Sequence, residues 1–192
     1  TRRSSDLFGL KQQCCNSLPC RPGLAGRVAL LFQKIERRYP MRSMVIGCDN
    51  AAVTLKNTLK QLLQEAGGPI EDVGAFSEKD SIEYPLIAKA VCEKIIQSGY
   101  QKRGVLVCGT GVGMCMTANK FKGIRAAVGH DIFSAQRSIL SNNGNVLCFG
   151  ERVIGPELAK TILKEWITLE FKDGPSTPKV RQINNVEAEN FR

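Results

Sequence analysis

The stretch GVLVCGTGVGMCMTANKFK, residues 104–122, decides the fold. A short apolar run leads into Cys108, and Gly109, Gly111 and Gly113 follow within five positions, ahead of a helical pattern. Glycines at this density permit positive φ and close approach of the backbone, so the pattern predicts a buried strand, a tight turn and a helix. In parallel α/β sheets, ligands bind outside the carboxyl ends of the strands, which makes this turn the first candidate for a functional site.

The composition describes one soluble domain of ordinary size with an extension. The chain has 192 residues, is 43% hydrophobic, and has no apolar run of the roughly 20 residues that a membrane span requires. Its formal charge is +9, but residues 1–40 hold eight Lys/Arg against two Asp/Glu, which leaves +3 for residues 41–192. Because the remainder has no recognition helix and no basic strand studded with aromatic residues, neither nucleic acid nor a membrane is an expected partner.

The cysteines indicate free thiols in a reducing compartment rather than a disulfide framework. Five of the eight lie in apolar, core-like segments, and there is no CxxC pair. With a single histidine in the chain, a zinc site has few available ligands, and we expect no metal and no cofactor. The cysteines are residues 14, 15, 20, 48, 92, 108, 115 and 148.

Residues 1–40 differ in composition from the rest of the chain. They are rich in Arg, Ser and Leu, poor in acids, and interrupted by Pro and Gly. This composition is typical of an organellar transit peptide, and it also arises from upstream sequence that is not part of a mature protein. We expect a disordered or removable extension, the alternative being a segment docked on the core. The expected location is cytoplasmic, or organellar if residues 1–40 are a transit peptide.

From residue 41 onward, short apolar runs alternate with helical patterns. Alternation of this kind predicts parallel strands joined by right-handed crossovers, hence an α/β fold with a three-layer, Rossmann-like doubly wound sheet of about five strands over residues 41–170. The polar tail, residues 171–192, contains a possible helix and is a candidate contact with a neighbouring subunit. The expected strands are 43–47, 70–74, 104–108, 124–129 and 146–150, and the expected helices 51–65, 84–98, 112–120, 133–141 and 156–169.

The glycine turn has three interpretations when its spacing is considered alone. With Thr110, its backbone N–H groups could hold an oxyanion or a phosphate, or the turn could be tight without binding any ligand. A dinucleotide-binding fingerprint would place its third glycine at position 114, where the chain has Met114. Asp131 lies near the place where a ribose-binding acid would be sought, which keeps that alternative open.

Four polar residues are expected at the same sheet edge, each with a structural alternative. Cys108 lies between a strand end and a helix start, where free N–H groups favour the thiolate, although it could be a small core residue. Asp49 could bind a ligand or cap the next helix. Arg152 could bind a phosphate through its planar guanidinium, or it could simply be exposed to solvent. His130 is a candidate general acid, or a polar residue at a strand end.

Several ordered motifs between residues 41 and 169 together resemble one family. The chain is similar to the ribose-5-phosphate isomerase B / galactose-6-phosphate isomerase (RpiB/LacAB) family, and Met41 falls where members of that family commonly begin. The motifs that carry the resemblance are Gly47-Cys48-Asp49, Cys108-Gly109-Thr110-Gly111-Val112-Gly113-Met114, Ala118-Asn119-Lys120, Gly123-Ile124-Arg125-Ala126-Ala127, Ser134-Ala135, Asn145-Val146-Leu147 and Gly150-Glu151-Arg152-Val153-Ile154-Gly155.

The resemblance implies a metal-free aldose-ketose isomerisation of a phosphorylated sugar through a cis-enediolate. The favoured pair is ribose 5-phosphate and ribulose 5-phosphate. Cys108 matches the base that moves a proton between C2 and C1, and Thr110 with the N–H groups of Gly109–Gly113 matches the pocket for the enediolate oxygen. The resemblance also implies a homodimer or homotetramer with sites between subunits.

Further binding residues follow from the same resemblance. Asp49 matches a contact to a sugar hydroxyl, Asn119 a residue of the pocket wall, and Arg152 an arginine at the edge of the site that faces the phosphate. In the tail, Lys179 and Pro175 stand where two basic residues are usual. Lys179 is therefore the one tail residue assigned to substrate binding.

The chain departs from the family pattern at two further positions. The histidine that usually follows the first aspartate is Asn50, and the ring-opening histidine before the Asn-rich turn is Ser141, which precedes Asn142. Neither Asn nor Ser titrates near neutral pH, so neither replaces a histidine acid-base. These positions are retained as substrate-binding candidates.

Three outcomes remain open from the sequence. The chain could be a working isomerase that uses His130 or takes sugar already in its open form. It could act on another phosphorylated substrate. It could instead bind sugar phosphate with little turnover, alone or as a subunit that needs a partner chain. The sequence does not choose between pentose and hexose.

Overall fold

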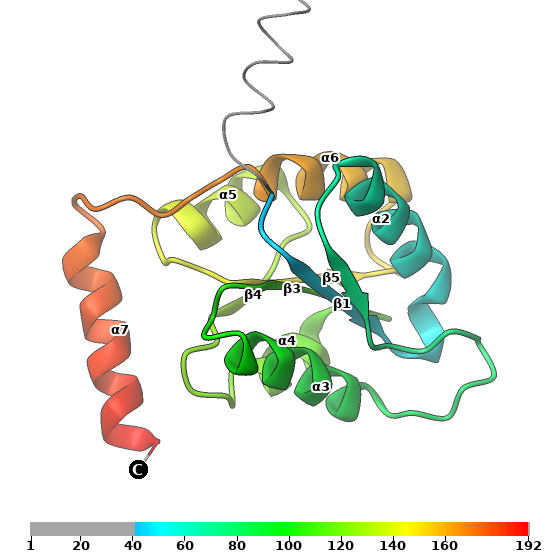
Figure 1. The fold of residues 1–192 in the computed structure, drawn as a ribbon, viewed down its shortest axis with the longest axis horizontal. Coiled ribbons are helices and arrows are strands. Elements are labelled where there is room, and N and C mark those ends of the chain that lie inside the picture. Colours follow the sequence, from blue (N-terminus) through cyan, green and yellow to red (C-terminus); the bar gives the residue numbers. More distant parts are fainter. Residues whose placement is uncertain (1–40, 192) are drawn as a thin grey trace, which may run out of the picture. The chain divides into compact units, whose positions relative to one another are not determined.

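A five-stranded parallel sheet forms the centre of the molecule (Figure 1). The computed structural model describes residues 41–191, so the predicted N-terminal extension lies outside the described residues. All four strand pairings in this sheet are parallel. In the strand order β2-β1-β3-β5-β4, β2 lies on one side of β1 and the remaining strands lie on the other. The strands are β1 (Met44–Cys48), β2 (Ile70–Asp72), β3 (Arg103–Cys108), β4 (Ala126–Val128) and β5 (Val146–Gly150).

Helices cover both faces of this sheet and complete the predicted three layers. Helices α2, α5 and α6 pack on one face, while α3 and α4 pack on the other. No helix within residues 41–191 is long and apolar enough to cross a membrane. The helices are η1 (Asn50–Ala52, 3-10), α2 (Val53–Glu65), α3 (Tyr84–Gln97), α4 (Val112–Ala118), α5 (Ile132–Leu140), α6 (Pro156–Trp166) and α7 (Thr177–Asn190).

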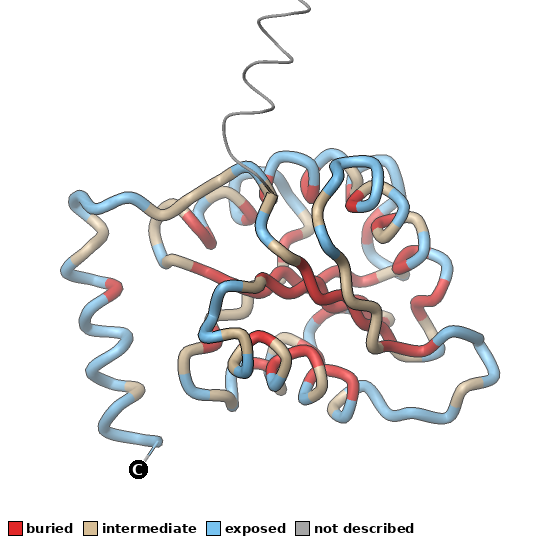
Figure 2. The backbone as a smooth tube through the Cα atoms, viewed as in Figure 1, coloured by how far each residue is buried: buried red, intermediate tan, exposed pale blue. Residues whose placement is uncertain are grey.

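Burial on both faces explains why the central strands are almost entirely apolar. All six residues of β3 are buried, and Figure 2 shows the central strands as a continuous buried band. Val105 and Val107 contact the core under α2 and α6, whereas Leu106 and Cys108 contact the core under α3 and α4. Successive side chains of a strand point to opposite faces, so a strand between two helix layers needs apolar residues at every position.

Two edge strands and two helices are shorter than the sequence patterns suggest. The predicted strands 70–74 and 124–129 contain regular strands of only three residues each, and all six of these residues are half-buried. Helix α4 ends at Ala118 rather than near Lys120, and α6 ends at Trp166 rather than Leu169. Apolar composition therefore predicts the position of these elements better than their ends.

The tail forms a helix that touches the body of the domain. Helix α7 is mostly exposed in Figure 2, with Val180 as its buried residue. The Gly123 N–H donates to the Glu187 Oε1 atom at 2.7 Å, which links α7 to the loop before β4. The possible helix in the tail is confirmed. Its contact with a neighbouring subunit remains a prediction.

Candidate active site

Cys108 ends the central strand β3 and faces the glycine turn. Its side chain is 6% exposed. The backbone N–H of Gly111 donates a hydrogen bond to the Cys108 Sγ atom, with a separation of 3.1 Å. This contact orients the sulfur toward the turn and directs the positive end of an N–H dipole at it. The carboxyl ends of β1, β3 and β5 lie at the same edge because the strands are parallel.

Two glycines allow the turn to pack against the end of β5. Gly111 is the N-cap of α4 and has a φ of 77°, a conformation that L side chains rarely adopt. A Cβ atom at Gly111 would lie 2.9 Å from the carbonyl carbon of Phe149. A Cβ atom at Gly150 would lie 2.5 Å from the carbonyl carbon of Thr110. The close packing requires glycine at both positions.

Some N–H groups of the turn already make hydrogen bonds within the protein, and only the others could bind a ligand. Gly111 N–H is engaged with Cys108, and the N–H of Val112 donates to the Thr110 hydroxyl oxygen at 3.4 Å. Thr110 is exposed. The predicted oxyanion pocket therefore has to rely on the Thr110 hydroxyl and the N–H groups of Gly109, Thr110 and Gly113.

Asp49 lies at the end of β1 and caps η1. Its Oδ1 atom accepts the N–H of Ala51 at 3.1 Å, which is the capping alternative that the sequence left open. Burial raises the pKa of the Asp49 carboxyl, while the Ala51 N–H and the charge of Arg152 lower it. The neighbouring Asn50 is exposed, and its Nδ2 atom donates to the Glu78 carbonyl at 3.5 Å. Capping uses one oxygen, so Asp49 can both hold the helix and contact a ligand.

Arg152 is held beside the glycine turn by its backbone. Its N–H donates to the Gly109 carbonyl at 3.1 Å, and the N–H of Glu151 donates to the Cys108 carbonyl at 2.9 Å. A Cβ atom at Gly109 would lie 3.6 Å from the Arg152 Nε atom. Arg152 is exposed, so its guanidinium provides an accessible positive charge next to Cys108 and Asp49.

His130 also lies at this edge, but its imidazole is used in the fold. The N–H of Gly150 donates to the His130 Nε2 atom at 2.8 Å. Burial lowers the pKa of His130, and the Asp131 carboxylate opposes this only in part. Asp131 itself caps α5, since its Oδ1 atom accepts the N–H of Ser134 at 2.7 Å. Asp131 therefore has a structural role as a helix cap, which is an alternative to the predicted ribose-binding role.

Four predicted binding residues lie away from Cys108 in the same chain. Asn119 follows the C-terminal end of α4, where its amide accepts from the Ala126 N–H at 2.8 Å and donates to the Ala126 carbonyl at 3.0 Å. Ser141 and Asn142 follow α5 and precede β5, at the amino edge of the sheet. Lys179 is exposed on α7. One chain alone does not bring these residues to the thiol.

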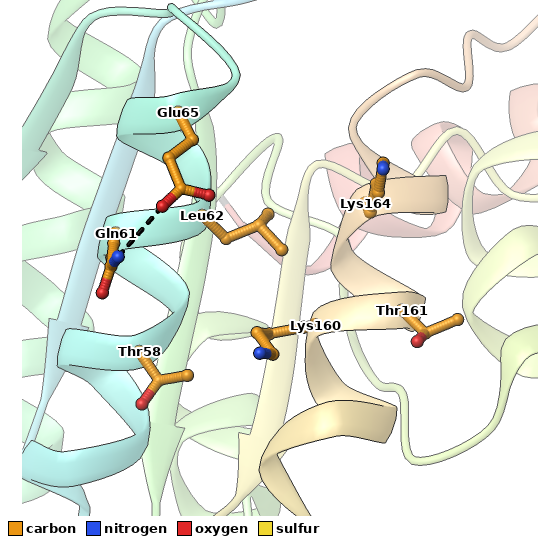
Figure 3. A pocket seen from close by; sticks show the side chains of 7 residues that line it. All are labelled: Thr58, Gln61, Leu62, Glu65, Lys160, Thr161 and Lys164. Atoms are coloured by element: carbon orange, nitrogen blue, oxygen red, sulfur yellow. Dashed lines mark hydrogen bonds between the residues drawn. The ribbon is translucent and has the colours of Figure 1, made fainter. Parts of the chain in front are cut away.

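Two hollows in the described part of the chain lie outside the Cys108 edge. A groove of about 270 Å³ runs between α2 and α6, with Leu62 at its centre and the Gln61 Nε2 atom 2.9 Å from Glu65 Oε1 (Figure 3). A larger hollow of about 530 Å³ between α7 and the β4 region includes Asn119 and Asn142. The groove is lined by Thr58, Gln61, Leu62, Glu65, Lys160, Thr161 and Lys164.

Sequence reasoning missed two side chains that lie on or against helix α4. A Cβ atom at Gly113 would lie 2.7 Å from Tyr84 Cε2, so the Tyr84 ring packs on the first turn of α4. The sequence treated Tyr84 only as part of a helix start, although an aromatic residue after a polar loop is a usable signal. Hydrogen bonds from the Cys148 thiol, the Val128 backbone and the Asn119 amide lower the pKa of Cys115 to about 7 against the effect of its burial. Cys115 is thus more than the core residue that the apolar pattern suggested.

The fold and the residues at this edge define a class of protein. Asp49 follows β1 and Cys108 ends β3, at the point between these neighbouring strands where the strand order reverses direction. Open parallel α/β sheets bind their ligands at such a switch point. The molecule is therefore a doubly wound α/β protein whose candidate ligand-binding edge presents a thiol, a glycine turn and an arginine.

The chain belongs to the ribose/galactose isomerase family, whose family model matches residues 44–183. It is 47% identical over 147 residues to D-erythrulose-4-phosphate isomerase from Pectobacterium atrosepticum, covering 77% of this chain and 96% of the relative. It is 39% identical to ribose-5-phosphate isomerase B from Escherichia coli, covering 77% of this chain and 97% of that one. The predicted membership is confirmed, and it places the chain among sugar-phosphate isomerases.

The fold agrees with solved structures of the same family. The type B ribose 5-phosphate isomerase of Leishmania infantum is 36% identical, with a TM-score of 0.72 over 79% of this chain and 99% of that chain. The structure from Mycoplasma genitalium with bound ribulose 5-phosphate has a TM-score of 0.74 at 28% identity. The predicted α/β architecture is confirmed.

Proposed function

We propose that the chain interconverts a phosphorylated aldose and the corresponding ketose through a cis-enediolate. In the aldose-to-ketose direction the proton on C2 moves to C1, O2 loses its proton, and O1 gains one. Atoms and charges balance without any added reactant. The observation that carries the proposal is the Cys108 Sγ atom at the end of β3, 3.1 Å from the Gly111 nitrogen that donates to it.

Cys108 is the proposed base of the proton transfer. A thiolate at this position would remove the proton from one carbon and return it to the adjacent carbon on the same face of the enediolate. General acid-base groups of this kind contribute factors of about 100 to 10,000 to the rate. The neighbouring thiols are less suitable: burial raises the pKa of both Cys48 and Cys92 to about 12.

The turn is the proposed site for the enediolate oxygen. The Thr110 hydroxyl is exposed, and the N–H groups of Gly109 and Gly113 belong to the same turn. Preorganised donors directed at a developing oxyanion are typically worth about 3 to 4 kcal/mol each. The positive φ of Gly111 supports this role because it keeps the turn close to Cys108.

Asp49 and Arg152 are the proposed contacts for the rest of the sugar. Asp49 has a second carboxylate oxygen available for a sugar hydroxyl beside its bond to Ala51. Arg152 presents a planar guanidinium beside Gly109, and this group suits bidentate binding of a phosphate. The charge of Arg152 would be placed a few bonds from the carbon that reacts at Cys108.

The complete site is proposed to lie between subunits of a homodimer or homotetramer. Asp49, Cys108 and Arg152 share the carboxyl edge of the sheet, whereas Ser141 and Asn142 lie at the amino edge. A second copy is the simplest source of Ser141 and Asn142 at a shared site. Lys179 and the whole of α7 would be available for the same interface. Because the five described cysteines are free thiols, a reducing compartment such as the cytoplasm is the proposed location.

A second candidate function is sugar-phosphate binding with little turnover. Asn50 and Ser141, which do not titrate near neutral pH, favour this alternative. Ribose 5-phosphate is the substrate favoured by the sequence. The relatives named for erythrulose 4-phosphate support a four-carbon sugar phosphate as well.

Proton NMR in deuterated water tests the proposal with a panel of phosphorylated aldoses and ketoses. The wild type is expected to convert at least one pair and to place solvent deuterium on the carbon that exchanges its proton. Cys108→Ala is expected to lose a factor of about 100 to 10,000 in turnover while still binding substrate. Equal rates for the two proteins would remove Cys108 as the base, and binding without turnover by the wild type would favour the second candidate.

A further inference from the structure

Ring closure divides phosphorylated sugars into two kinds of substrate. Ribose 5-phosphate closes a furanose ring through its free O4 hydroxyl, so an enzyme that takes the ring must first move protons on and off the ring oxygens. A four-carbon sugar 4-phosphate has its O4 esterified, and its remaining hydroxyls could close only small, strained rings. It therefore stays open and presents its carbonyl directly. Ring opening calls for an acid-base group whose pKa lies near the working pH.

The imidazole at the carboxyl edge is poorly suited to that proton transfer. His130 is the single histidine of the sequence, and its Nε2 atom accepts the Gly150 N–H at 2.8 Å. An accepting nitrogen carries no proton, so the imidazole is neutral with its proton on Nδ1. Protonation at Nε2 would direct two N–H groups at each other. Burial also lowers the pKa of His130, which favours the same neutral form of the imidazole.

The carboxylates at this edge are likewise tied to backbone N–H groups. Asp49 accepts from Ala51 at 3.1 Å, and Asp131 accepts from Ser134 at 2.7 Å. Glu151 Oε2 accepts the N–H of Leu55 at 3.1 Å, which joins the end of β5 to α2. The bond from Ser134 lowers the pKa of Asp131, whereas burial raises the pKa of Asp49 against the effect of its bond from Ala51. Each of the three carboxylates therefore has one oxygen held by a backbone N–H.

The proton-transfer part of the edge is, by contrast, well formed. Cys108, the Thr110 turn and Arg152 are held together by the bonds from Gly111 to the thiol and from Arg152 to the Gly109 carbonyl. Ser141 and Asn142, which a second copy would add, bring a hydroxyl and an amide. The site is equipped to move a proton between two carbons of an open chain, whereas its imidazole is engaged with the backbone of Gly150.

We infer that the preferred substrates are sugar phosphates that cannot close a furanose ring, and specifically four-carbon aldose and ketose 4-phosphates. The inference rests on the proposed isomerase function and narrows its substrate class. Since such a substrate needs no ring-opening acid, the imidazole of His130 is free to serve the fold. Ribose 5-phosphate would react only through its minor open-chain fraction.

Three substrates separate ring closure from chain length. They are erythrose 4-phosphate, ribose 5-phosphate and 4-deoxyribose 5-phosphate, a five-carbon compound that lacks the O4 hydroxyl and stays open. Erythrose 4-phosphate and 4-deoxyribose 5-phosphate are expected to give kcat/KM values about 100-fold to 10,000-fold above that of ribose 5-phosphate, which is the range of one missing acid-base group. Comparable values for ribose and erythrose phosphates would overturn the inference, as would a slow reaction of the deoxy compound.

A second readout uses the concentration of the full-length protein. Once spontaneous ring opening becomes limiting, the rate with ribose 5-phosphate is expected to stop rising with protein concentration, while the rate with erythrose 4-phosphate continues to rise. His130→Gln serves as the matched variant and is expected to change all three kcat/KM values by one common factor. A selective loss with ribose 5-phosphate would show that His130 opens the ring and would overturn the inference.

Different results would contradict the isomerase proposal and the inference about its substrates. If no substrate is converted, or if Cys108→Ala converts all three as fast as the wild type, the isomerase proposal itself is wrong. If Cys108 is required but ribose 5-phosphate reacts as fast as the open substrates, only the substrate inference is wrong.

Discussion

Two neighbouring strands, β1 and β3, both end in a cysteine at the same edge of the sheet, yet the two thiols have opposite surroundings. Cys48 pairs in register with Val107, one residue before Cys108. Cys48 is fully buried, donates to the Ala75 carbonyl at 3.5 Å, and has its pKa raised by burial to about 12. Cys108 instead accepts an N–H from Gly111 at 3.1 Å.

The difference comes from the face of the sheet and from the residues that follow each strand. Cys48 contacts the core under α2 and α6, and Cys108 the core under α3 and α4. After Cys48 the chain enters η1 with Asp49 as its cap, whereas after Cys108 a glycine turn bends back over the sulfur. A strand end alone therefore does not direct a backbone N–H at a thiol. The turn that follows it supplies the donors.

Replacing each of the two cysteines by alanine is the strongest test of this comparison. Cys108→Ala is expected to reduce isomerase turnover by about 100-fold to 10,000-fold because it removes the proposed base. Cys48→Ala is expected to keep turnover within about threefold, and to lower the free energy of unfolding by about 1 to 2 kcal/mol through the cavity that it leaves. Steady-state assays and urea titrations measure the two effects.

Cys108→Ser provides a control close in size to the native residue. It should keep the fold while replacing the thiol by a much weaker acid. Full activity in Cys108→Ser, or a loss of turnover in Cys48→Ala at unchanged stability, would contradict the division of roles between the two thiols.

The turn itself can be tested at Gly111, with Gly67 as the matched position. Both glycines have positive φ, 77° and 82°, but a Cβ atom at Gly67 would have no neighbour within 4 Å. Gly67→Ala is expected to cost about 1 kcal/mol in unfolding free energy, from backbone strain alone. Gly111→Ala is expected to cost about 1 to 3 kcal/mol more because its methyl group meets Phe149 and the turn must shift.

Turnover distinguishes these glycine variants further. Gly111→Ala should also lower kcat, since the N–H that orients the Cys108 sulfur moves with the turn. Gly67→Ala should leave kcat unchanged. Equal costs in stability at the two positions, measured by urea unfolding, would show that contact with Phe149 is unimportant.

The smallest predicted effect is a pH dependence of stability. The Cys48 thiol titrates near 9.0 when unfolded and at a pKa of about 12 in the fold, where burial keeps it protonated. Its stabilising contribution is therefore complete below pH 9 and is lost as pH rises toward 12. The difference in unfolding free energy between wild type and Cys48→Ala should shrink by about 1 kcal/mol between pH 8 and pH 10.

Val45→Ala is the matched control for this pH series. Val45 is buried in the same strand and carries no titrating group. Its cost in unfolding free energy should stay constant across the pH range. A constant cost for Cys48→Ala as well would mean that the Cys48 thiol titrates alike in the folded and unfolded chains.

Most of the fold could be predicted from the sequence because apolar runs buried on both faces leave a clear pattern. The carboxyl-edge positions of Asp49, Cys108 and Arg152 followed from parallel strands alone. The placement of Asn119, Ser141 and Asn142 did not follow, because a match of motifs does not show whether a side chain reaches the site from its own chain.

Side-chain hydrogen bonds were the other limit of sequence reasoning. The hydrogen bond from the Gly150 N–H to His130 depends on how two loops meet at the sheet edge. The packing of Tyr84 on Gly113 depends on the approach of α3 to α4. Local patterns carry no information on either contact.

The chain also carries a built-in optical reporter. Trp166 is the single tryptophan of the sequence, and it is fully buried with its Nε1 atom donating to the Ser138 hydroxyl at 3.0 Å. Arg103 lies over its ring at 5.3 Å from the centroid. The indole belongs to the helix layer of α2 and α6, whereas Cys108 belongs to the opposite core. We therefore expect its fluorescence to follow the unfolding of this layer and to respond little to a ligand bound at the thiol.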